Sequence, residues 1–232
     1  MTIIEKYVKS KVEVGIPGID DLIGGGLPRK STVLLRGQAG SGKTIFSLQY
    51  LISGALNGEP GILLSIEESR EDLYSECAQF GWDLGSLVEE GMISIIERQT
   101  EYGLTIHELE KNAKLIGAKR AVVDSLPSLF SSFPKEIEPS EYRIAFQLLC
   151  QVLMKSCGCT SILISETGWF KDTRFEEYVP KGVIELYSKM MDGVSRKFLL
   201  IRKMREVRHS RKEHLYEITS KGFTLFIPRI RK

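Results

Sequence analysis

The chain has 232 residues, of which 42% are apolar and 27% are charged, and its formal net charge is +2. This balance is typical of globular proteins and excludes both the high charge of intrinsic disorder and the long apolar runs of membrane proteins. No linker rich in Pro, Ser or acidic residues interrupts the chain, so we expect one domain over residues 1–232.

The sequence carries no sign of export. Its first residues lack the apolar core of a secretion signal, and no later run approaches the roughly 20 apolar residues that span a bilayer. The cysteines are too few and too irregularly spaced for a disulfide scaffold, and no second ligand pair accompanies them as in a zinc site. We therefore expect a cytoplasmic protein without membrane contact, with free thiols at Cys77, Cys150, Cys157 and Cys159.

Charge is distributed unevenly along the chain. Residues 1–187 contain 19 Lys and Arg against 26 Asp and Glu, a net charge of −7, whereas residues 188–232 contain 13 against 4, a net charge of +9. A basic C-terminal segment suits a nucleic acid or another acidic partner. It equally suits the acidic part of a neighbouring copy in an oligomer.

Short apolar runs alternate with helical patterns up to about residue 165. The runs are nearly continuous, as in strands that are buried on both faces, and they cover residues 32–35, 62–66, 92–96, 121–124 and 161–165. Helices are predicted over residues 43–56, from Ser69 to Gly81, from a capping box at Thr105, and over residues 140–155. The pattern predicts an α/β fold with a mainly parallel twisted sheet flanked by helices.

The pattern changes after Gly182. Strand-like pieces follow one another directly at residues 183–187, 198–203, 215–218 and 223–226, with a turn signal at Lys221 and Gly222. We expect these pieces to add antiparallel strands at the C-terminal edge of the sheet.

The strongest motif lies between the first buried strand and the first helix. It matches G-x-x-x-x-G-K-[ST], the phosphate-binding P-loop, in which glycines let backbone N–H groups close on phosphate oxygens at a helix N-terminus. The lysine of such a loop reaches the β- and γ-phosphates, and the Thr hydroxyl binds Mg²⁺. The predicted nucleotide-binding residues are Gly37, Gln38, Ala39, Gly40, Ser41, Gly42, Lys43, Thr44 and Ile45.

Carboxylates end two other predicted strands. Asp124 closes a buried strand at the edge where ligands of open α/β sheets bind, so with Thr44 it is the candidate Mg²⁺ residue, although an Asp at this position also serves as a turn former. Glu67 and Glu68 end another strand, and we choose Glu67 to orient the attacking water, with Glu68 as the second candidate. Both carboxylates would also favour the N-terminus of the helix that follows Ser69.

These motifs resemble, as a set, those of the KaiC and RadA-paralogue group of RecA-like ATPases. The resemblance runs from about residue 14 to residue 227 and rests on the P-loop, on residues 15–28 before it, on residues 65–68 and on the late run 203–209. It implies a RecA-like P-loop fold, ATP and Mg²⁺ as ligands, and ATP hydrolysis.

The resemblance also implies self-assembly. In this group ATP lies between subunits of a hexameric ring or a filament, and a Lys-x-Arg pair of the neighbour approaches the γ-phosphate. Lys203 and Arg205 match that pair. A cation delivered in trans stabilises the charge on the phosphoryl oxygens in the transition state, which is worth about 10³ to 10⁵ in rate for arginine fingers.

Two departures limit what the resemblance carries over. Clock proteins of the group have two such domains and this chain has one, so no autophosphorylation site is transferred. Glu166 stands at the strand end where recombinases often place a glutamine, which weakens an inference of strand exchange.

Residues 167–175 occupy the place of a DNA-contacting loop in recombinases. Their aromatic and cationic side chains would suit stacking on single-stranded bases, and the candidate DNA contacts are Trp169, Phe170, Lys171 and Arg174. The acidic neighbours Asp172, Glu176 and Glu177 favour the alternative, in which the aromatic rings pack under the loop or into a subunit interface.

We therefore expect a self-assembling Mg²⁺-dependent ATPase that acts as a nucleotide-driven switch. One alternative is an ATPase that binds single-stranded DNA and modulates recombination or repair. Another is a slow ATP-sensing module that binds a protein partner.

Overall fold

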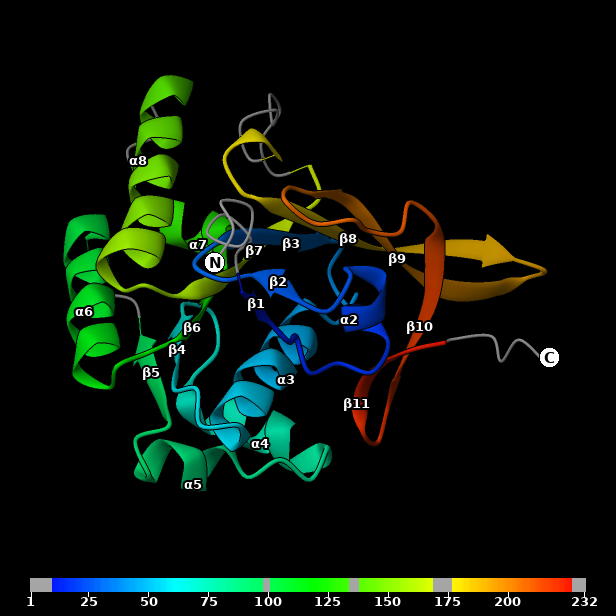
Figure 1. Ribbon diagram of the computed structural model, residues 1–232, viewed down its shortest axis with the longest axis horizontal. Coiled ribbons are helices and arrows are strands. Elements are labelled where there is room, and N and C mark those ends of the chain that lie inside the picture. Colours follow the sequence, from blue (N-terminus) through cyan, green and yellow to red (C-terminus); the bar gives the residue numbers. More distant parts are fainter. Residues whose placement is uncertain (1–9, 98–100, 134–137, 169–176, 227–232) are drawn as a thin grey trace, which may run out of the picture.

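A mixed sheet of nine strands organises the protein in a computed structural model, which describes residues 10–97, 101–133, 138–168 and 177–226 (Figure 1). The strand order is β11-β10-β9-β8-β3-β7-β6-β4-β5. The strands are β3 (Thr32–Gly37), β4 (Gly61–Ser65), β5 (Ile93–Glu97), β6 (Arg120–Asp124), β7 (Thr160–Glu166), β8 (Gly182–Met191), β9 (Val194–Met204), β10 (Glu213–Thr219) and β11 (Gly222–Leu225). A separate antiparallel pair consists of β1 (Lys11–Val12) and β2 (Leu27–Pro28).

Helices cover both faces of this sheet. Figure 1 shows α3, α4 and α5 together below the strands and α6 and α8 together at the other side. The helices are α2 (Ile19–Leu22), α3 (Lys43–Leu56), α4 (Arg70–Gln79), α5 (Leu84–Glu89), α6 (Tyr102–Leu115), α7 (Leu126–Phe130) and α8 (Pro139–Gln151), and a π-helical turn (Val152–Ser156) continues α8.

The near-continuous apolarity of the central strand explains the two layers of helices. Successive side chains of a strand point to opposite faces. In β3, Val33 and Leu35 therefore face the core under α3, α4 and α5, whereas Leu34 faces the core under α6, α7 and α8. All three side chains are fully buried.

The predicted fold class, a mainly parallel sheet flanked by helices, is confirmed. The five predicted strands correspond to β3, β4, β5, β6 and β7, which pair in parallel. The expectation for the residues after Gly182 was only partly right. β8 pairs in parallel with β3, and only its pairing with β9 and the pairings of β9, β10 and β11 are antiparallel.

The prediction that a helix starts with a capping box at Thr105 was wrong. α6 begins at Tyr102, and Thr105 is buried inside the helix, where its hydroxyl donates to the carbonyl oxygen of Glu101 at 2.9 Å. A buried hydroxyl that bonds to the preceding turn is compatible with a helix interior. α7 was also not predicted, since its Ser- and Pro-containing sequence is typical of a turn.

All four cysteines are free, and three of them are buried: Cys77, Cys150 and Cys159. Within the described ranges, no helix combines the length and apolarity needed to cross a membrane.

A buried guanidinium connects α3 to the start of β6. Arg120 is 3% exposed and donates to Glu59 at 2.7 and 2.9 Å and to the carbonyl oxygen of Tyr50 at 2.8 Å. Its guanidinium carbon lies 4.7 Å from the centre of the Tyr50 ring. Removing this cation leaves a buried carbonyl and a partly buried carboxylate without their donor.

We expect Arg120→Ala to lower the free energy of unfolding by about 3 to 5 kcal/mol, the usual cost of breaking a buried ion pair from one side. The measurement is urea denaturation. Arg29→Ala is the matched control, because Arg29 binds the same Glu59 at 3.0 Å from a side chain that is 37% exposed, where a loss below about 1 kcal/mol is expected. Equal losses in the two variants would contradict this account.

Candidate functional site

The carboxyl ends of the parallel strands bring the predicted site residues to one edge of the sheet. Gly37, at the end of β3, pairs with Glu166 of β7 on one side and with Leu186 of β8 on the other. On the neighbouring strands Ser65 pairs with Asp124, so that Glu67 and Glu68 follow directly beside Asp124. Residues that are far apart in the sequence therefore lie close together, because the carboxyl ends of parallel strands lie at the same edge of the sheet.

Glycines in the P-loop occupy places that other residues would not fit. Gly40 and Gly42 have positive φ angles of 72° and 88°, and Gly42 caps the N-terminus of α3. A Cβ atom on Gly37 would lie 2.5 Å from the carbonyl oxygen of Leu186 and 2.6 Å from the Ser41 Oγ. The loop is thus held close to β8 with its backbone N–H groups near a helix N-terminus, a geometry that attracts anions.

Lys43 begins α3 and folds back over the loop. Its Nζ donates to the carbonyl oxygens of Gly37 and Gln38, both at 3.0 Å. Burial lowers the pKa of Lys43, and the negative charges of Glu166, Asp124 and Glu67 oppose that effect. An ammonium held by two carbonyls at the loop is well placed to exchange them for phosphate oxygens.

Thr44 and Asp124 lie in direct contact. The Thr44 hydroxyl donates to Asp124 Oδ2 at 2.8 Å. Burial, with the nearby negative charges of Glu68 and Glu67, raises the pKa of Asp124 to about 6, against the opposing effect of the Thr44 hydrogen bond. A hydroxyl and a carboxylate at this distance are the hard oxygen donors that Mg²⁺ uses at P-loops, directly or through water.

Glu67 is held by two hydroxyl groups that sequence reasoning missed. Ser125 Oγ donates to Glu67 Oε1 at 2.7 Å, and Ser128 Oγ of α7 donates to the same oxygen. The hydroxyls orient the carboxylate beside Asp124. Ser125 directly precedes α7 and Ser128 lies in it, and no local motif pointed to that helix.

Glu68 takes a different position from Glu67. It lines a pocket of about 200 Å³ at the P-loop together with Lys43, Thr44 and Glu76 of α4. Burial raises the pKa of Glu68, and Glu76 is the first of several carboxylates that raise it further. Glu76 was not among the predicted site residues.

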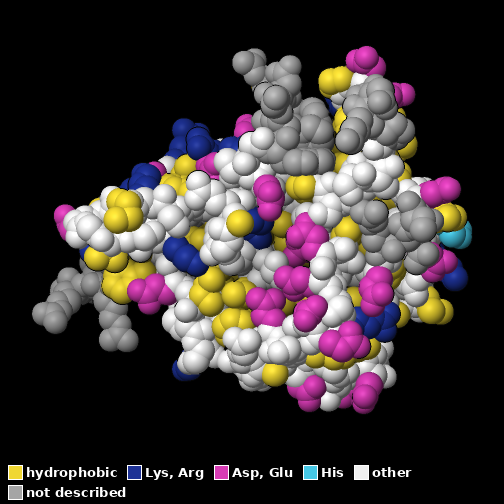
Figure 2. Space-filling view, turned by 180° about the vertical axis from the view of Figure 1, so that it is seen from behind, with side chains coloured by type: hydrophobic (Ala, Val, Ile, Leu, Met, Phe, Trp, Pro, Cys, Tyr) yellow, Lys and Arg dark blue, Asp and Glu magenta, His cyan; other side chains and the backbone are white. Residues whose placement is uncertain are grey.

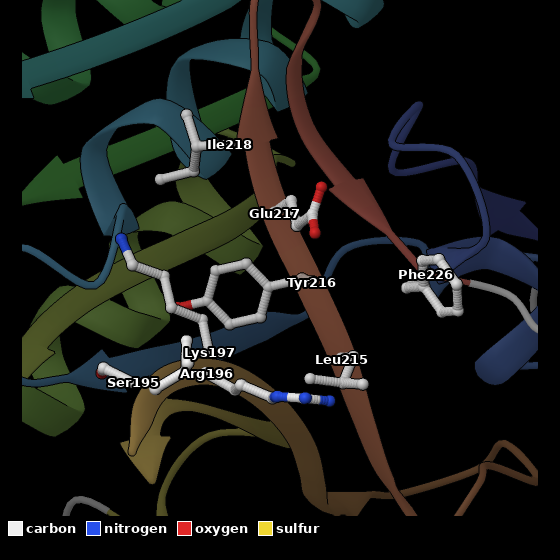
Figure 3. A pocket seen from close by; sticks show the side chains of 9 residues that line it. Ser195, Arg196, Lys197, Leu215, Tyr216, Glu217, Ile218 and Phe226 are labelled. Carbon is white, nitrogen blue, oxygen red and sulfur yellow. The ribbon is translucent and has the colours of Figure 1, made fainter. Parts of the chain in front are cut away.

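The antiparallel strands support the P-loop from outside. The buried Tyr216 hydroxyl of β10 donates to the carbonyl oxygen of Ser41 at 2.6 Å, and Lys197 Nζ of β9 donates to that of Gly40 at 2.9 Å. Figure 3 shows Lys197 extending from β9 towards the turn before α3, with Ile218 beside that turn and Phe226 on the far side of β10. These residues line a cavity of about 550 Å³ next to the loop.

Lys203 and Arg205 lie at the opposite edge of the sheet. Lys203 pairs with Val183 at the start of β8, whereas β8 reaches the P-loop only at Leu186. Burial and the charge of Arg205 lower the pKa of Lys203 to about 8, and its Nζ donates to the carbonyl oxygen of Glu177. The structure thus brings together the P-loop, Asp124, Glu67 and Glu68, but not the Lys-x-Arg pair of the same chain.

The candidate DNA contacts Trp169, Phe170, Lys171 and Arg174 lie outside the described residues, so that hypothesis stays a prediction. Two acidic residues flank that segment among the described residues: Glu166 at the end of β7 and Glu177 directly after the segment.

The fold and this site together define a RecA-like P-loop protein, with a phosphate-binding loop after the central strand and an acidic strand end beside it.

Comparisons with known proteins specify the family. A family model described as "ATPase: KaiC" matches residues 12–229. A UPF0273 protein of Aeropyrum pernix is 35% identical over 238 residues, which cover 93% of both chains. The circadian clock protein KaiC2 of Synechocystis is 35% identical over 93% of this chain but only 40% of its own length. The chain belongs to the KaiC family of ATPases.

A solved structure agrees with this assignment. The crystal structure of a KaiC-like protein from Pyrococcus horikoshii superposes with a TM-score of 0.84 at 37% sequence identity, and the match covers 94% of this chain and 100% of that one.

We expect Tyr216→Phe to destabilise the protein by roughly 1 to 3 kcal/mol, because it leaves the buried Ser41 carbonyl without its donor. Urea denaturation measures the loss. Tyr178→Phe, at a side chain that is 62% exposed, is the control and should change stability by less than about 0.5 kcal/mol. A neutral Tyr216→Phe would show that the hydroxyl does not support the loop.

Proposed function

We propose that the protein binds ATP with Mg²⁺ at the P-loop and hydrolyses it to ADP and phosphate. The observation that carries the proposal is the position of Lys43 and Thr44 at the start of α3, with the Thr44 hydroxyl 2.8 Å from Asp124. The residues proposed to hold the nucleotide are Gly37, Gln38, Ala39, Gly40, Ser41, Gly42, Lys43, Thr44 and Ile45.

The chain's own groups fit a phosphate and a divalent cation. Ser41 Oγ is buried and makes no hydrogen bond to any described residue, so it offers the loop a further polar group. Thr44 and Asp124 would hold Mg²⁺, which would neutralise phosphate charge when bound. Lys43 leaves the carbonyls of Gly37 and Gln38 to contact the β- and γ-phosphates.

Glu67 is proposed to orient the water that attacks the γ-phosphate. Its carboxylate is fixed by Ser125 and Ser128 and acts electrostatically on both Lys43 and Asp124. A carboxylate that is already oriented can accept a proton from water at little further entropic cost. Glu68 is the second candidate because it lines the pocket at the P-loop.

We expect Lys43→Ala to abolish ATP binding and Glu67→Gln to reduce the hydrolysis rate at least about 100-fold while ATP still binds. Calorimetric titration with ATP and a phosphate-release assay separate the two steps. Glu68→Gln is the matched comparison, and a larger loss in Glu68→Gln than in Glu67→Gln would reverse the assignment. Normal ATP binding by Lys43→Ala would refute the site.

The cavity beside the loop supports an assignment for the other end of the nucleotide. Lys197, Ile218 and Glu217 line it, and Lys197 already contacts Gly40. An apolar side chain with a few polar groups is the usual surface for a base and its ribose. We assign the nucleoside to this side of the P-loop, between β9 and β10.

Lys203 and Arg205 are proposed to serve the active site of a neighbouring copy. Met204, between Lys203 and Arg205, pairs with Gly182 of β8. The residue of β3 that pairs with Gly182 lies four residues before Gly37, which corresponds to about 13 Å along the strand. The pair lines a pocket of about 440 Å³ with Arg202, His209 and Arg211. A basic edge on one copy and an acidic edge on the next favour head-to-tail assembly.

Mixing two inactive variants tests this geometry. Arg205→Ala lacks the arginine but keeps the P-loop, and Lys43→Ala lacks phosphate binding but keeps the arginine. If the pair acts in trans, each variant alone should lose about 10³-fold or more in ATP hydrolysis, and their mixture should regain part of it at interfaces where both groups are intact.

The control mixture combines Arg205→Ala with the double variant Lys43→Ala and Arg205→Ala, which has no arginine to supply. Recovery in both mixtures, or in neither, would contradict action in trans.

A further inference from the structure

Glu76 of α4 lines the pocket beside the P-loop. On this helix Leu73 and Cys77 are buried against the sheet, while Glu76, between them in the sequence, is half-buried. It lines the 200 Å³ pocket with Lys43, Thr44 and Glu68. The buried side chains of α4 fix the orientation of the helix about its axis, and this orientation brings a charged side chain to the P-loop.

One carboxylate oxygen of Glu76 lacks a hydrogen-bond partner among the described residues. Its Oε2 atom is buried and forms no hydrogen bond with any group in the described part of the chain. Burial raises the pKa of Glu76, and the negative charge of Asp124 raises it further, so the two carboxylates lie within electrostatic reach of each other. A buried polar atom without a partner costs about 1 to 3 kcal/mol, which a bound water or ion would remove.

Glu76 does not serve the helix that carries it. The N-terminus of α4 is capped by Ser69, with Asp72 completing the capping box. Glu76 is the seventh residue of the helix, beyond the first turn in which a carboxylate gains from the helix dipole. A stabilising role for α4 therefore does not account for its charge.

The negative charge around the pocket favours binding of a cation. Glu166, Asp124 and Glu67 act electrostatically on Lys43, and Glu68 and Glu76 line a pocket with it. A nucleotide adds several negative charges to these carboxylates, and one ammonium group does not balance them. Mg²⁺ at a P-loop keeps several of its waters, and those waters donate hydrogen bonds to surrounding acceptors.

We propose that Glu76 is a positioning residue for the nucleotide-bound Mg²⁺, accepting a hydrogen bond from metal-bound water on the α4 side of Thr44. Asp124 serves the other side, so two carboxylates orient the hydration shell. The inference rests on the proposed function, since it requires nucleotide and Mg²⁺ at the P-loop. It assigns to α4 a part in metal binding that the P-loop and the strand ends do not supply.

The proposal predicts two effects of opposite sign for Glu76→Gln. Outer-shell partners of metal sites are worth about 10-fold or more in metal affinity, so the Mg²⁺ concentration that half-saturates ADP binding should rise by about 10-fold. Without Mg²⁺, in EDTA, the affinity for ADP should increase at least about twofold, because a negative charge near the phosphates has been removed.

Calorimetric titration of the full chain with ADP, across a range of Mg²⁺ concentrations and in EDTA, measures both effects without turnover. Glu71→Gln is the matched control on the exposed side of the same helix and should leave both unchanged. Glu76→Asp, which keeps the charge, should recover part of the Mg²⁺ affinity.

The outcomes separate the two proposals. If the wild type does not bind ADP with Mg²⁺, the proposed function fails. If the wild type binds and Glu76→Gln has the same Mg²⁺ dependence, only the role of Glu76 is refuted. A parallel loss of affinity with and without Mg²⁺, together with a lower melting temperature, would also refute it, because a structural role would produce that result.

Discussion

The position of β3 between β7 and β8 is the constraint on which the rest of the structure depends. Parallel pairing on both sides fixes Gly37 at the carboxyl edge, next to Glu166 and Leu186. α3 then starts where its N-terminus faces that edge, and the ends of β4 and β6 bring their carboxylates to the same place. Figure 2 views the molecule from behind and shows Asp and Glu side chains gathered in the middle and lower part of the visible face. Asp124, Glu67, Glu68 and Glu76 therefore lie around the P-loop, and the proposed Mg²⁺ would offset their charge when a nucleotide binds.

Much of the fold could be predicted because its signals are local. A continuous apolar run indicates a buried strand, and eight consecutive residues define the P-loop. β3 to β7 and α3 could therefore be predicted from the sequence. The resemblance to a known family was needed to propose a role for Lys203 and Arg205, because their local sequence does not suggest one. The order of the strands, including the parallel pairing of β8 with β3, depends on contacts between distant segments. It could not be predicted from local sequence patterns.

The parts of the site that were missed share one physical cause. Ser125, Ser128 and Glu76 acquire their roles from tertiary packing. Ser125 and Ser128 contact Glu67 from 58 and 61 residues away in the sequence. Glu76 reaches the P-loop pocket because Leu73 and Cys77 fix which side of α4 faces the core. Tyr216 was missed for the same reason, since its partner Ser41 is 175 residues away in the sequence. Thr105 gave a false local signal. Its spacing to Glu108 is that of a capping box, but it lies inside a helix that begins one turn earlier.

The central place of β3 has a consequence for the order in which the molecule is made. β3 ends at Gly37, yet its two neighbours in the sheet, β7 and β8, begin only at Thr160 and Gly182 and are synthesised much later. A growing chain therefore carries an apolar strand without its native partners until β7 and β8 have left the ribosome, and open strand edges can pair with other chains. The strand that holds the phosphate-binding loop is also the one that depends longest on segments not yet made.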